Sequence, residues 1–267
     1  MRARPPVVVY VTREEPLTAI DQLLVFDFPG DPDYRAIVPG GGVEPGETPA
    51  EAARRKALEE TGVEVEVVRE VGTLPGSRFF QAAPVGPTRD EWEHTKTPGD
   101  ELVRCRWVTI RSGLEVWGER GTFIDALIRR RVVVYATRER EGRMELLTIE
   151  HVEYPEAGIQ VPAGRVDHDE ELEDGLRREL AEETGIRDVR IVGEIPDFDC
   201  TYETFSRNHA FHVVVDVATP DQWEHLVYGT GDDAGLTYLC RWVPLRLGLP
   251  LWNEGDPMLA KLPIRGA

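Results

Sequence analysis

Three glutamates in the second half of the chain have the spacing of a metal-binding helix face. Glu179, Glu182 and Glu183 stand three and four residues apart in the segment RRELAEETG, residues 177–185. At 3.6 residues per turn, side chains with this spacing lie on one face of a helix, where their like charges repel each other. A divalent cation would relieve that repulsion, and Mg²⁺ is a hard ion that prefers oxygen ligands. The spacing therefore favours a site for Mg²⁺ or Mn²⁺.

The chemistry that such a site supports is hydrolysis of a diphosphate bond. A bound metal ion neutralises phosphate charge, polarises phosphorus and lowers the pKa of a bound water, and a carboxylate can take the proton from that water. The turn VPAG at residues 161–164 would let a backbone carbonyl, that of Gly164, join the metal ligands. Arg178 and Glu170 are expected to form a structural pair that orients the helix against this turn.

One helix in each half must position these residues. It is predicted to lie between a glycine-containing turn and the sequence EETG, with an N-terminal capping box in the first half and a C-terminal glycine in both. The predicted boundary residues are Thr48, Pro49, Glu51 and Gly62 in the first half, and Asp169 or a neighbouring residue with Gly185 in the second.

The two halves are copies of each other. The segment 177–185 is nearly repeated at 54–62 as RRKALEETG, and three shorter matches keep the same order. Apolar runs rich in β-branched residues predict strands on both sides of the helix. The chain is therefore predicted to hold two mixed α/β domains, residues 1–130 and 131–267. The shorter matches are VVVYVTRE at 7–14 with VVVYATRE at 132–139, WEH at 92–94 with 223–225, and CRWV at 105–108 with 240–243.

The second copy resembles the Nudix box, G-x5-E-x7-R-E-U-x-E-E-x-G-U, where U is an aliphatic residue. Its segment at residues 164–186 fills every specified place. The first copy, residues 41–63, has Ala57 where a larger aliphatic residue is usual, and it fails at Lys56, which stands where the second copy has Glu179. The residues that match in the second copy are Gly164, Glu170, Arg178, Glu179, Leu180, Glu182, Glu183, Gly185 and Ile186.

The resemblance covers both copies and implies two tandem Nudix-type α/β/α sandwich domains. It implies hydrolysis of a nucleoside diphosphate linked to another group, with Glu179 and Glu183 as metal ligands. Glu182 is the third expected ligand, and one of the three glutamates is expected to act as the base. Members of the family commonly add a carboxylate from outside the box, and the unranked candidates are Glu203, Glu224, Asp232 and Asp233. The first copy is expected to take the part of a second subunit in an intramolecular pseudo-dimer.

Lys56 predicts a division of labour between the copies. It is within reach of Glu59 and Glu60 on the same helix face, so its ammonium group can fill the space and supply the charge of a metal ion. Losing a ligand and adding a positive charge both oppose Mg²⁺ binding. We therefore predict that the first copy does not catalyse, with weakened activity or a nucleotide-holding role as the alternatives.

The segment CTYETFSRNH, residues 200–209, lies in a stretch that is ten residues shorter in the first copy, and it is expected to line the substrate pocket. Tyr202, Arg207 and His209 are candidates for substrate binding, and His212 continues their pattern. A tyrosine near this place accompanies dinucleoside polyphosphate substrates in some relatives, whereas VPAG is more similar to the ADP-ribose and sugar-nucleotide branch. Capped or oxidised nucleotides are a further alternative, and a non-catalytic nucleotide sensor is the rival function.

Charge and composition restrict the partners. The 267-residue chain has a formal net charge of −18, with 18 basic and 22 acidic residues up to Arg131 and 13 and 27 after it. Such a surface repels phosphate backbones, so a long nucleic acid is not expected. No apolar run reaches the ~18 residues that cross a bilayer, and Cys105, Cys200 and Cys240 lack disulfide or metal spacing. We expect a cytoplasmic protein with a small nucleotide substrate and no membrane partner.

Overall fold

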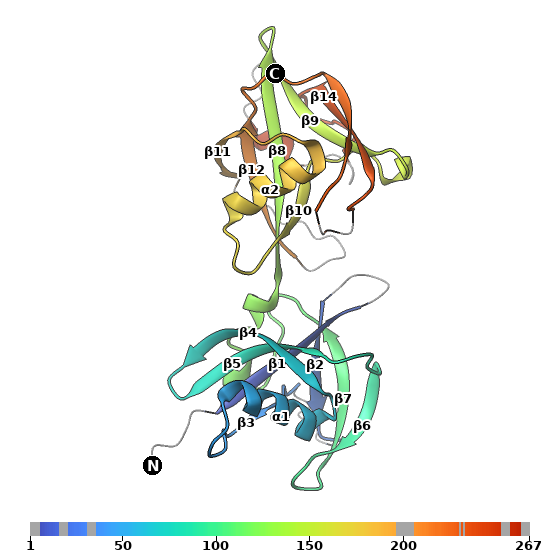
Figure 1. Ribbon diagram of the computed structural model, residues 1–267. Coiled ribbons are helices and arrows are strands. Elements are labelled where there is room, and N and C mark those ends of the chain that lie inside the picture. Colours follow the sequence, from blue (N-terminus) through green and yellow to red (C-terminus); the bar gives the residue numbers. More distant parts are fainter. Residues whose placement is uncertain are drawn as a thin grey trace. The chain divides into compact units, whose positions relative to one another are not determined.

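The computed structural model describes residues 6–15, 21–30, 36–195, 206–229, 231, 233–251 and 257–262. The chain divides into two compact units that meet in the sequence between Ile128 and Arg129 (Figure 1). Each unit has one mixed sheet and one α-helix among its described residues. The predicted mixed α/β fold in two tandem copies is therefore confirmed.

The first unit is a seven-stranded sheet with the order β4-β5-β1-β2-β7-β6, and β3 pairs with Val7 and Val8 at the start of β1. Strands β1 and β5 are parallel, and the other pairs are antiparallel. Two short 3₁₀ helices follow the last strand. The elements are β1 (Val7–Glu14), β2 (Asp21–Asp27), β3 (Gly40–Gly41), α1 (Pro49–Thr61), β4 (Val65–Leu74), β5 (Ser77–Pro84), β6 (Glu91–Thr95), β7 (Leu102–Thr109), η1 (Gly118–Gly121) and η2 (Ile124–Leu127).

The second unit repeats this topology strand for strand, with the order β11-β12-β8-β9-β14-β13 and β10 pairing with β8. Its one parallel pair, β8 with β12, corresponds to β1 with β5. The elements are β8 (Arg129–Arg140), β9 (Arg143–His151), η3 (Pro155–Ala157), β10 (Ala163–Val166), α2 (Leu172–Thr184), β11 (Arg190–Ile195), β12 (Ser206–Val214), β13 (Gln222–Leu226), β14 (Thr237–Pro244) and η4 (Pro257–Lys261).

Each sheet separates two hydrophobic layers because alternate strand residues face opposite sides. In the second unit, Val132 and Val134 pack with Leu176 and Leu180 of α2, whereas Val133 and its neighbours on the other face pack with Leu259 and Leu262 at η4. The first unit repeats this arrangement with α1 on one face and η2 on the other. The cysteine and tryptophan of the repeated CRWV segment are buried in both units, as Cys105 and Trp107 in the first and Cys240 and Trp242 in the second.

The ends of the two helices are built differently. In α1, Thr48 and Glu51 form the predicted capping box, Pro49 begins the helix and Gly62 ends it at φ 75°. Helix α2 ends as predicted at Gly185, with φ 78°, but its N-cap residue is Glu171, whose side chain makes no capping hydrogen bond, and Asp169 lies before it. The loop before α2 is instead stabilised by one of its own side chains: the Glu170 carboxylate accepts the backbone N–H of Asp167 at 3.1 Å.

Among the described residues, no helix has both the length and the apolar character needed to cross a membrane.

Candidate active site

Two of the three glutamates of α2, Glu179 and Glu183, lie against the strand β10 that precedes the helix, whereas the Glu182 carboxylate lies at Gly229, where a Cβ atom would come within 2.7 Å of Glu182 Oε2. Glu179 and Glu183 are buried, with 9% and 5% of their surface exposed, and Glu182 is half-buried. Glu183 Oε2 accepts the backbone N–H of Ala163 at 3.0 Å. The Glu179 carboxylate lies directly over Gly164, where a Cβ atom would come within 1.9 Å of Glu179 Cδ. A residue without a side chain is therefore required at Gly164 for the carboxylate to lie there.

Arg178 connects this helix to the loop before it. Its guanidinium donates Nε–H and Nη2–H to the two carboxylate oxygens of Glu170, both at 2.8 Å, and a further hydrogen bond to the carbonyl of Arg165 at 2.7 Å. The third nitrogen, Nη1, lies 2.8 Å from Glu179 Oε1 and 3.3 Å from Glu182 Oε2. The expected pair of Arg178 and Glu170 is present, and it extends to two of the three glutamates.

The C-terminal turn of α2 is held by the WEH segment of β13. Trp223 Nε1 donates to the carbonyl of Thr184 at 2.9 Å, and His225 Nε2 lies 3.0 Å from the carbonyl of Glu182. Carbonyls in the last turn of a helix have no partner within the helix, so these side chains complete its C-terminus. Sequence reasoning used WEH only to align the two copies, although its repetition marked a role that both copies need.

The same contacts recur at the end of α1. Trp92 Nε1 donates to the carbonyl of Thr61 at 2.8 Å, and His94 Nε2 lies 3.1 Å from the carbonyl of Glu59. In both units, the histidine ring also packs against the glycine that ends the helix. The WEH segment is therefore part of the scaffold that orients the last helical turn, where two of the three candidate carboxylates lie.

Burial makes the carboxylates of the second unit costly to ionise. Burial raises the pKa of Glu179, and it raises the pKa of Glu183 well above its usual range, with the nearby Glu179 charge adding to the effect. In the first unit, burial also raises the pKa of Glu59, but hydrogen bonds from Lys56 and Arg55 outweigh it and lower the value overall. The second unit thus holds carboxylates whose ionised form is disfavoured by burial and would be stabilised by a nearby cation.

The donor set of the second unit fits a hard divalent cation. Its groups are carboxylate oxygens, and the buried Glu183 accepts one hydrogen bond from the described residues, which leaves acceptor capacity for an ion. Within the described part of the chain, no three His, Cys, Asp or Glu side chains are already arranged around one point. The guanidinium of Arg178 lies between two of the glutamates, with Nη1 2.8 Å from Glu179 Oε1 and 3.3 Å from Glu182 Oε2.

The structure separates the candidates for an additional carboxylate. Asp233 lies near Glu183 and Tyr238: burial is the main reason why the pKa of each of these groups is raised, and the charge of Asp233 raises it further. Glu224 is exposed on β13, between the two residues that face α2, so it points to the opposite side of the strand. Asp233 is therefore the better placed of these two. Glu203 and Asp232, and the substrate candidate Tyr202, lie outside the described residues.

The other substrate candidates lie on β12. Arg207 is exposed, and His209 is half-buried with Nδ1 2.7 Å from Glu194 Oε1. His212 is buried on the sheet face opposite α2, where its Nε2 lies 2.9 Å from Thr137 Oγ1. The expectation that His212 continues a ligand-binding pattern is wrong, because strand alternation turns it away from the helix that carries the glutamates.

Lys56 lies in the first unit where Glu179 lies in the second. A Cβ atom on Gly41 would come within 2.7 Å of Lys56 Cε, so the lysine covers Gly41 as Glu179 covers Gly164. Its ammonium lies 2.7 Å from Glu59 Oε2. We expected Lys56 to reach Glu60 as well, but among the described residues Glu60 pairs with the ammonium of Lys96, at 3.8 Å.

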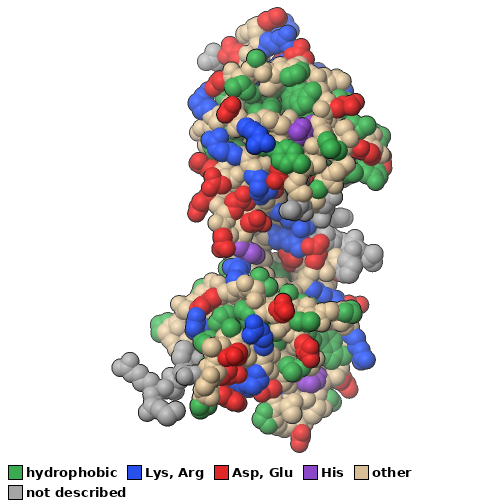
Figure 2. All heavy atoms as spheres, in the orientation of Figure 1, with side chains coloured by type: hydrophobic (Ala, Val, Ile, Leu, Met, Phe, Trp, Pro, Cys, Tyr) green, Lys and Arg blue, Asp and Glu red, His purple; other side chains and the backbone are tan. Residues whose placement is uncertain are grey.

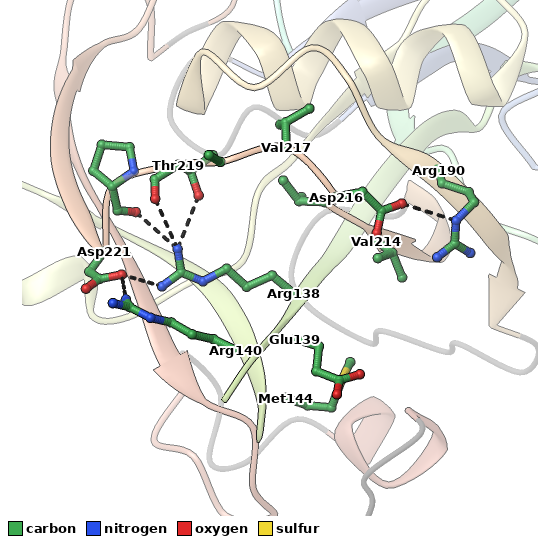
Figure 3. Close-up of a pocket in the computed structure, with 13 residues that line it drawn as sticks. Arg138, Glu139, Arg140, Met144, Arg190, Val214, Asp216, Val217, Thr219 and Asp221 are labelled. Carbon is green, nitrogen blue, oxygen red and sulfur yellow. Dashed lines mark hydrogen bonds and ion pairs between the residues drawn. The ribbon is translucent and has the colours of Figure 1, made fainter. Parts of the chain in front are cut away.

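A cavity of about 710 Å³ in the second unit lies between the end of β8 and residues 214–221 (Figure 3). Figure 3 shows the Arg138 guanidinium pointing toward Thr219 and Asp221, with hydrogen bonds of 3.3 Å and 2.6 Å, and Arg190 paired with Asp216. These arginines are therefore engaged by the protein itself.

The Arg138 arrangement also has a counterpart in the first unit. Arg13 donates to Thr88 at 3.0 Å and to Asp90 at 2.5 Å, and it stacks on Trp107 as Arg138 stacks on Trp242. Because both units have this cluster, we interpret it as a structural clamp on a loop and place the candidate active site at α2.

Comparisons with known proteins agree with this architecture. A family model described as NUDIX domain matches residues 2–126 and again residues 127–262. Over 67 residues the chain is 42% identical to an RNA pyrophosphohydrolase of Bartonella bacilliformis, a match that spans 23% of this chain and 39% of that protein.

Two solved structures of low sequence identity are also similar. A UDP-X diphosphatase is 16% identical with a TM-score of 0.33, covering 45% of this chain and 57% of that one. The NUDIX domain of Shewanella oneidensis NrtR, in complex with ADP ribose, is 18% identical with a TM-score of 0.31, covering 44% of this chain and 73% of that one. Likenesses of this size say nothing about what this chain binds. The family model, however, matches the chain twice and almost throughout, and the chain therefore belongs to the Nudix hydrolase family, with two NUDIX domains in tandem.

Proposed function

We propose that the second unit hydrolyses the diphosphate linkage of a small nucleoside diphosphate derivative with the help of Mg²⁺ or Mn²⁺. The observation that carries this proposal is the gathering of Glu179, Glu182 and Glu183 on one face of α2, with two of them buried against β10. Uncompensated carboxylates at such positions destabilise a fold, so their presence is explained by a cation that they bind.

The residues divide the work as follows. Glu179, Glu182, Glu183 and the carbonyl of Gly164 would hold the ion, which supplies phosphate charge neutralisation and an acidified water. One of the three glutamates would accept the proton of the attacking water. Arg178 holds the helix to the preceding loop and keeps two carboxylates on the same side.

The first unit, residues 1–130, is proposed to be non-catalytic, and the second, residues 131–267, to carry the activity. In the first unit the carboxylates of Glu59 and Glu60 face the ammonium groups of Lys56 and Lys96. These groups neutralise the site internally. Position 179 has no such lysine, because Glu179 replaces it.

The substrate is proposed to be small, such as ADP-ribose, a sugar nucleotide or a dinucleoside polyphosphate. The chain after Arg131 carries 13 basic and 27 acidic residues, and Figure 2 shows acidic side chains gathered where α2 and the loop before it lie. This charge opposes a polyanion but not one diphosphate that arrives with its metal ion. The two described cysteines are free and buried, and we propose a cytoplasmic location.

The test is hydrolysis of a panel of nucleoside diphosphate derivatives with Mg²⁺ and with Mn²⁺, using Glu183→Gln and its positional counterpart Glu60→Gln. Both glutamates accept a backbone N–H at 3.0 Å, from Ala163 and Gly40, so the two variants perturb the same contact. We expect Glu183→Gln to lower turnover at least about 100-fold, more than is typical for residues that only orient a metal ligand.

Glu60→Gln should leave turnover within about twofold of the wild type, since surrounding contacts in the second unit are unchanged. Equal losses in both variants would contradict the division of labour. Absence of turnover of every compound by a folded, Mn²⁺-binding wild type would instead favour a nucleotide sensor.

A further inference from the structure

One row of residues crosses the sheet of the second unit beneath α2. Gly164 of β10 and His209 of β12 both pair with Val132 of β8, from opposite sides. Paired residues of neighbouring strands face the same side of a sheet, and strands are about 4.8 Å apart, so Gly164 and His209 lie roughly 10 Å apart. Val132 packs in the core layer of α2, which places His209 on the same face as Glu179.

The imidazole of His209 is held by one nitrogen and leaves the other without a protein partner. Nδ1 lies 2.7 Å from Glu194 Oε1 on β11. Nε2 is buried, and no described residue makes a hydrogen bond to it. A buried polar atom without a partner destabilises a fold, so it is a candidate for contact with a ligand. Because Nδ1 bonds the carboxylate of Glu194, Nε2 is the nitrogen left to contact a ligand, and as an N–H group it donates a hydrogen bond to an anion.

The first unit has the same row with different residues. Gly41 and Arg78 both pair with Val7, so Arg78 corresponds to His209. Its guanidinium is taken up by Glu70 through two hydrogen bonds, one of them from Nε at 2.9 Å.

Glu70 corresponds to Glu194 by the same reasoning. Glu70 pairs with Phe80 of β5, which in turn pairs with Val9 of β1. Glu194 pairs with Phe211 of β12, which in turn pairs with Val134 of β8, the counterpart of Val9. The carboxylate is thus kept in both units. Its partner is an arginine that donates two hydrogen bonds to it in the first unit, and a histidine with one open nitrogen in the second.

We propose that His209, oriented by Glu194, contacts the diphosphate of the substrate through Nε2, beside the metal-binding carboxylates of α2. The inference rests on the proposed function, because it presupposes a diphosphate bound at Glu179 and Glu183. It adds a direct protein contact to a charged phosphate oxygen. The first unit has Arg78 and Lys56 where the second has His209 and Glu179. Both differences therefore separate the unit that is proposed to be inactive from the one that is proposed to be active.

The test uses the full chain and the variants His209→Arg, His209→Gln and Arg78→His. His209→Arg restores the residue of the first unit beside a retained glutamate, an arrangement that already exists in this fold. For each variant we would measure the melting temperature, Mn²⁺ affinity by electron paramagnetic resonance, kcat and KM for the best panel substrate, and ADP affinity by calorimetry with Mn²⁺ present.

We expect His209→Arg to raise KM and weaken ADP binding about tenfold or more, the loss typical of one hydrogen bond to a charged group. Mn²⁺ affinity and the melting temperature should match the wild type. His209→Gln, whose amide can still donate, should recover part of the loss, and Arg78→His should change neither parameter. Wild-type KM and ADP affinity in His209→Arg would overturn the proposal and leave His209 a structural partner of Glu194.

The calorimetry separates this proposal from the proposed function. If the wild type binds ADP with Mn²⁺ but hydrolyses nothing, the hydrolase proposal fails, and the role of His209 is decided by whether His209→Arg weakens ADP. If the wild type binds neither ADP nor Mn²⁺, both proposals fail.

Discussion

Gly164 decides at the residue scale whether a carboxylate can lie against β10. A methyl group there would meet Glu179 Cδ at 1.9 Å, so Gly164→Ala must displace the carboxylate. We expect Mn²⁺ affinity and kcat/KM to fall about 10- to 100-fold, the range seen when a metal ligand loses its orienting neighbour. Stability should change little, because the displaced group is the end of a flexible side chain.

The matched control is Gly41→Ala, which would press on Lys56 Cε at 2.7 Å in the first unit. It should leave metal affinity and kcat/KM unchanged. A Gly164→Ala protein with wild-type Mn²⁺ affinity would mean that Glu179 does not bind the ion from this position.

His212 gives the second unit a pH-dependent stability. Burial lowers the pKa of His212 from 6.5, and the charge of Arg190 lowers it further. Below pH 6.5 the unfolded chain therefore binds more protons at this residue than the folded one. Its contribution to the free energy of unfolding is complete above pH 6.5 and is lost as the pH falls below that value.

We expect His212→Gln, which can keep a hydrogen bond to Thr137, to unfold with a smaller decline in stability between pH 7 and pH 5 than the wild type. Calorimetric scans across that range would measure it. Parallel curves for the two proteins would show that His212 is not the group responsible.

Residue periodicity predicted which carboxylates share a helix face, and local spacing predicted the pair of Arg178 and Glu170. The role of Lys96 could not be predicted in this way, because it comes from the end of β6 and meets Glu60 only through tertiary packing. The pairing of His209 with Glu194 was missed for the same reason: it depends on the register between β11 and β12, which no local pattern specifies.

At the element scale, the WEH segment of β13 supplies side chains that bind the last carbonyls of α2. Trp223→Phe would keep the ring but remove the donor to the carbonyl of Thr184, at a cost of about 1 kcal/mol in the stability of the second unit. The last turn of α2 should then open more often, since its carbonyls lose a partner. Hydrogen exchange of the amides near the end of α2 would measure this opening.

Trp92→Phe removes the same contact from α1 and should destabilise the first unit by a similar amount. Only Trp223→Phe should also lower kcat/KM, because only α2 is proposed to hold the metal. If both variants lowered kcat/KM equally, the prediction would fail, because the loss would then come from lower stability or from an effect on both units.

Helix existence and both glycine ends were predictable because capping depends on nearby residues. The start of α2 was not predicted accurately, because no side chain caps it and the acidic residues before it offer several equivalent beginnings. Strand order could not be obtained from the sequence at all. The parallel pairing of β8 with β12 joins segments some 75 residues apart, such as Val132 with His209.

At the scale of the whole molecule, duplication has produced two nearly identical frameworks that differ in how their carboxylates are neutralised. In α1, Lys56 and Lys96 face Glu59 and Glu60. When the two copies are aligned on their WEH segments, Lys96 matches Val227, which is buried in the core of the second unit. Two substitutions thus separate an internally neutralised site from the one that we propose binds a cation.

Lys56→Glu combined with Lys96→Val should therefore create a metal site in the first unit, because it restores the residues of the second at both positions. The substitutions are best made in a Glu183→Gln background, so that bound Mn²⁺ reports the first unit. Without metal, three neighbouring carboxylates should destabilise α1, and Mn²⁺ should restore the melting temperature as its concentration exceeds the dissociation constant. Lys56→Glu alone should bind Mn²⁺ more weakly, since the Lys96 ammonium still lies near Glu60. A double variant that binds no Mn²⁺ and melts independently of it would show that the lysines are not what keeps the first unit free of metal.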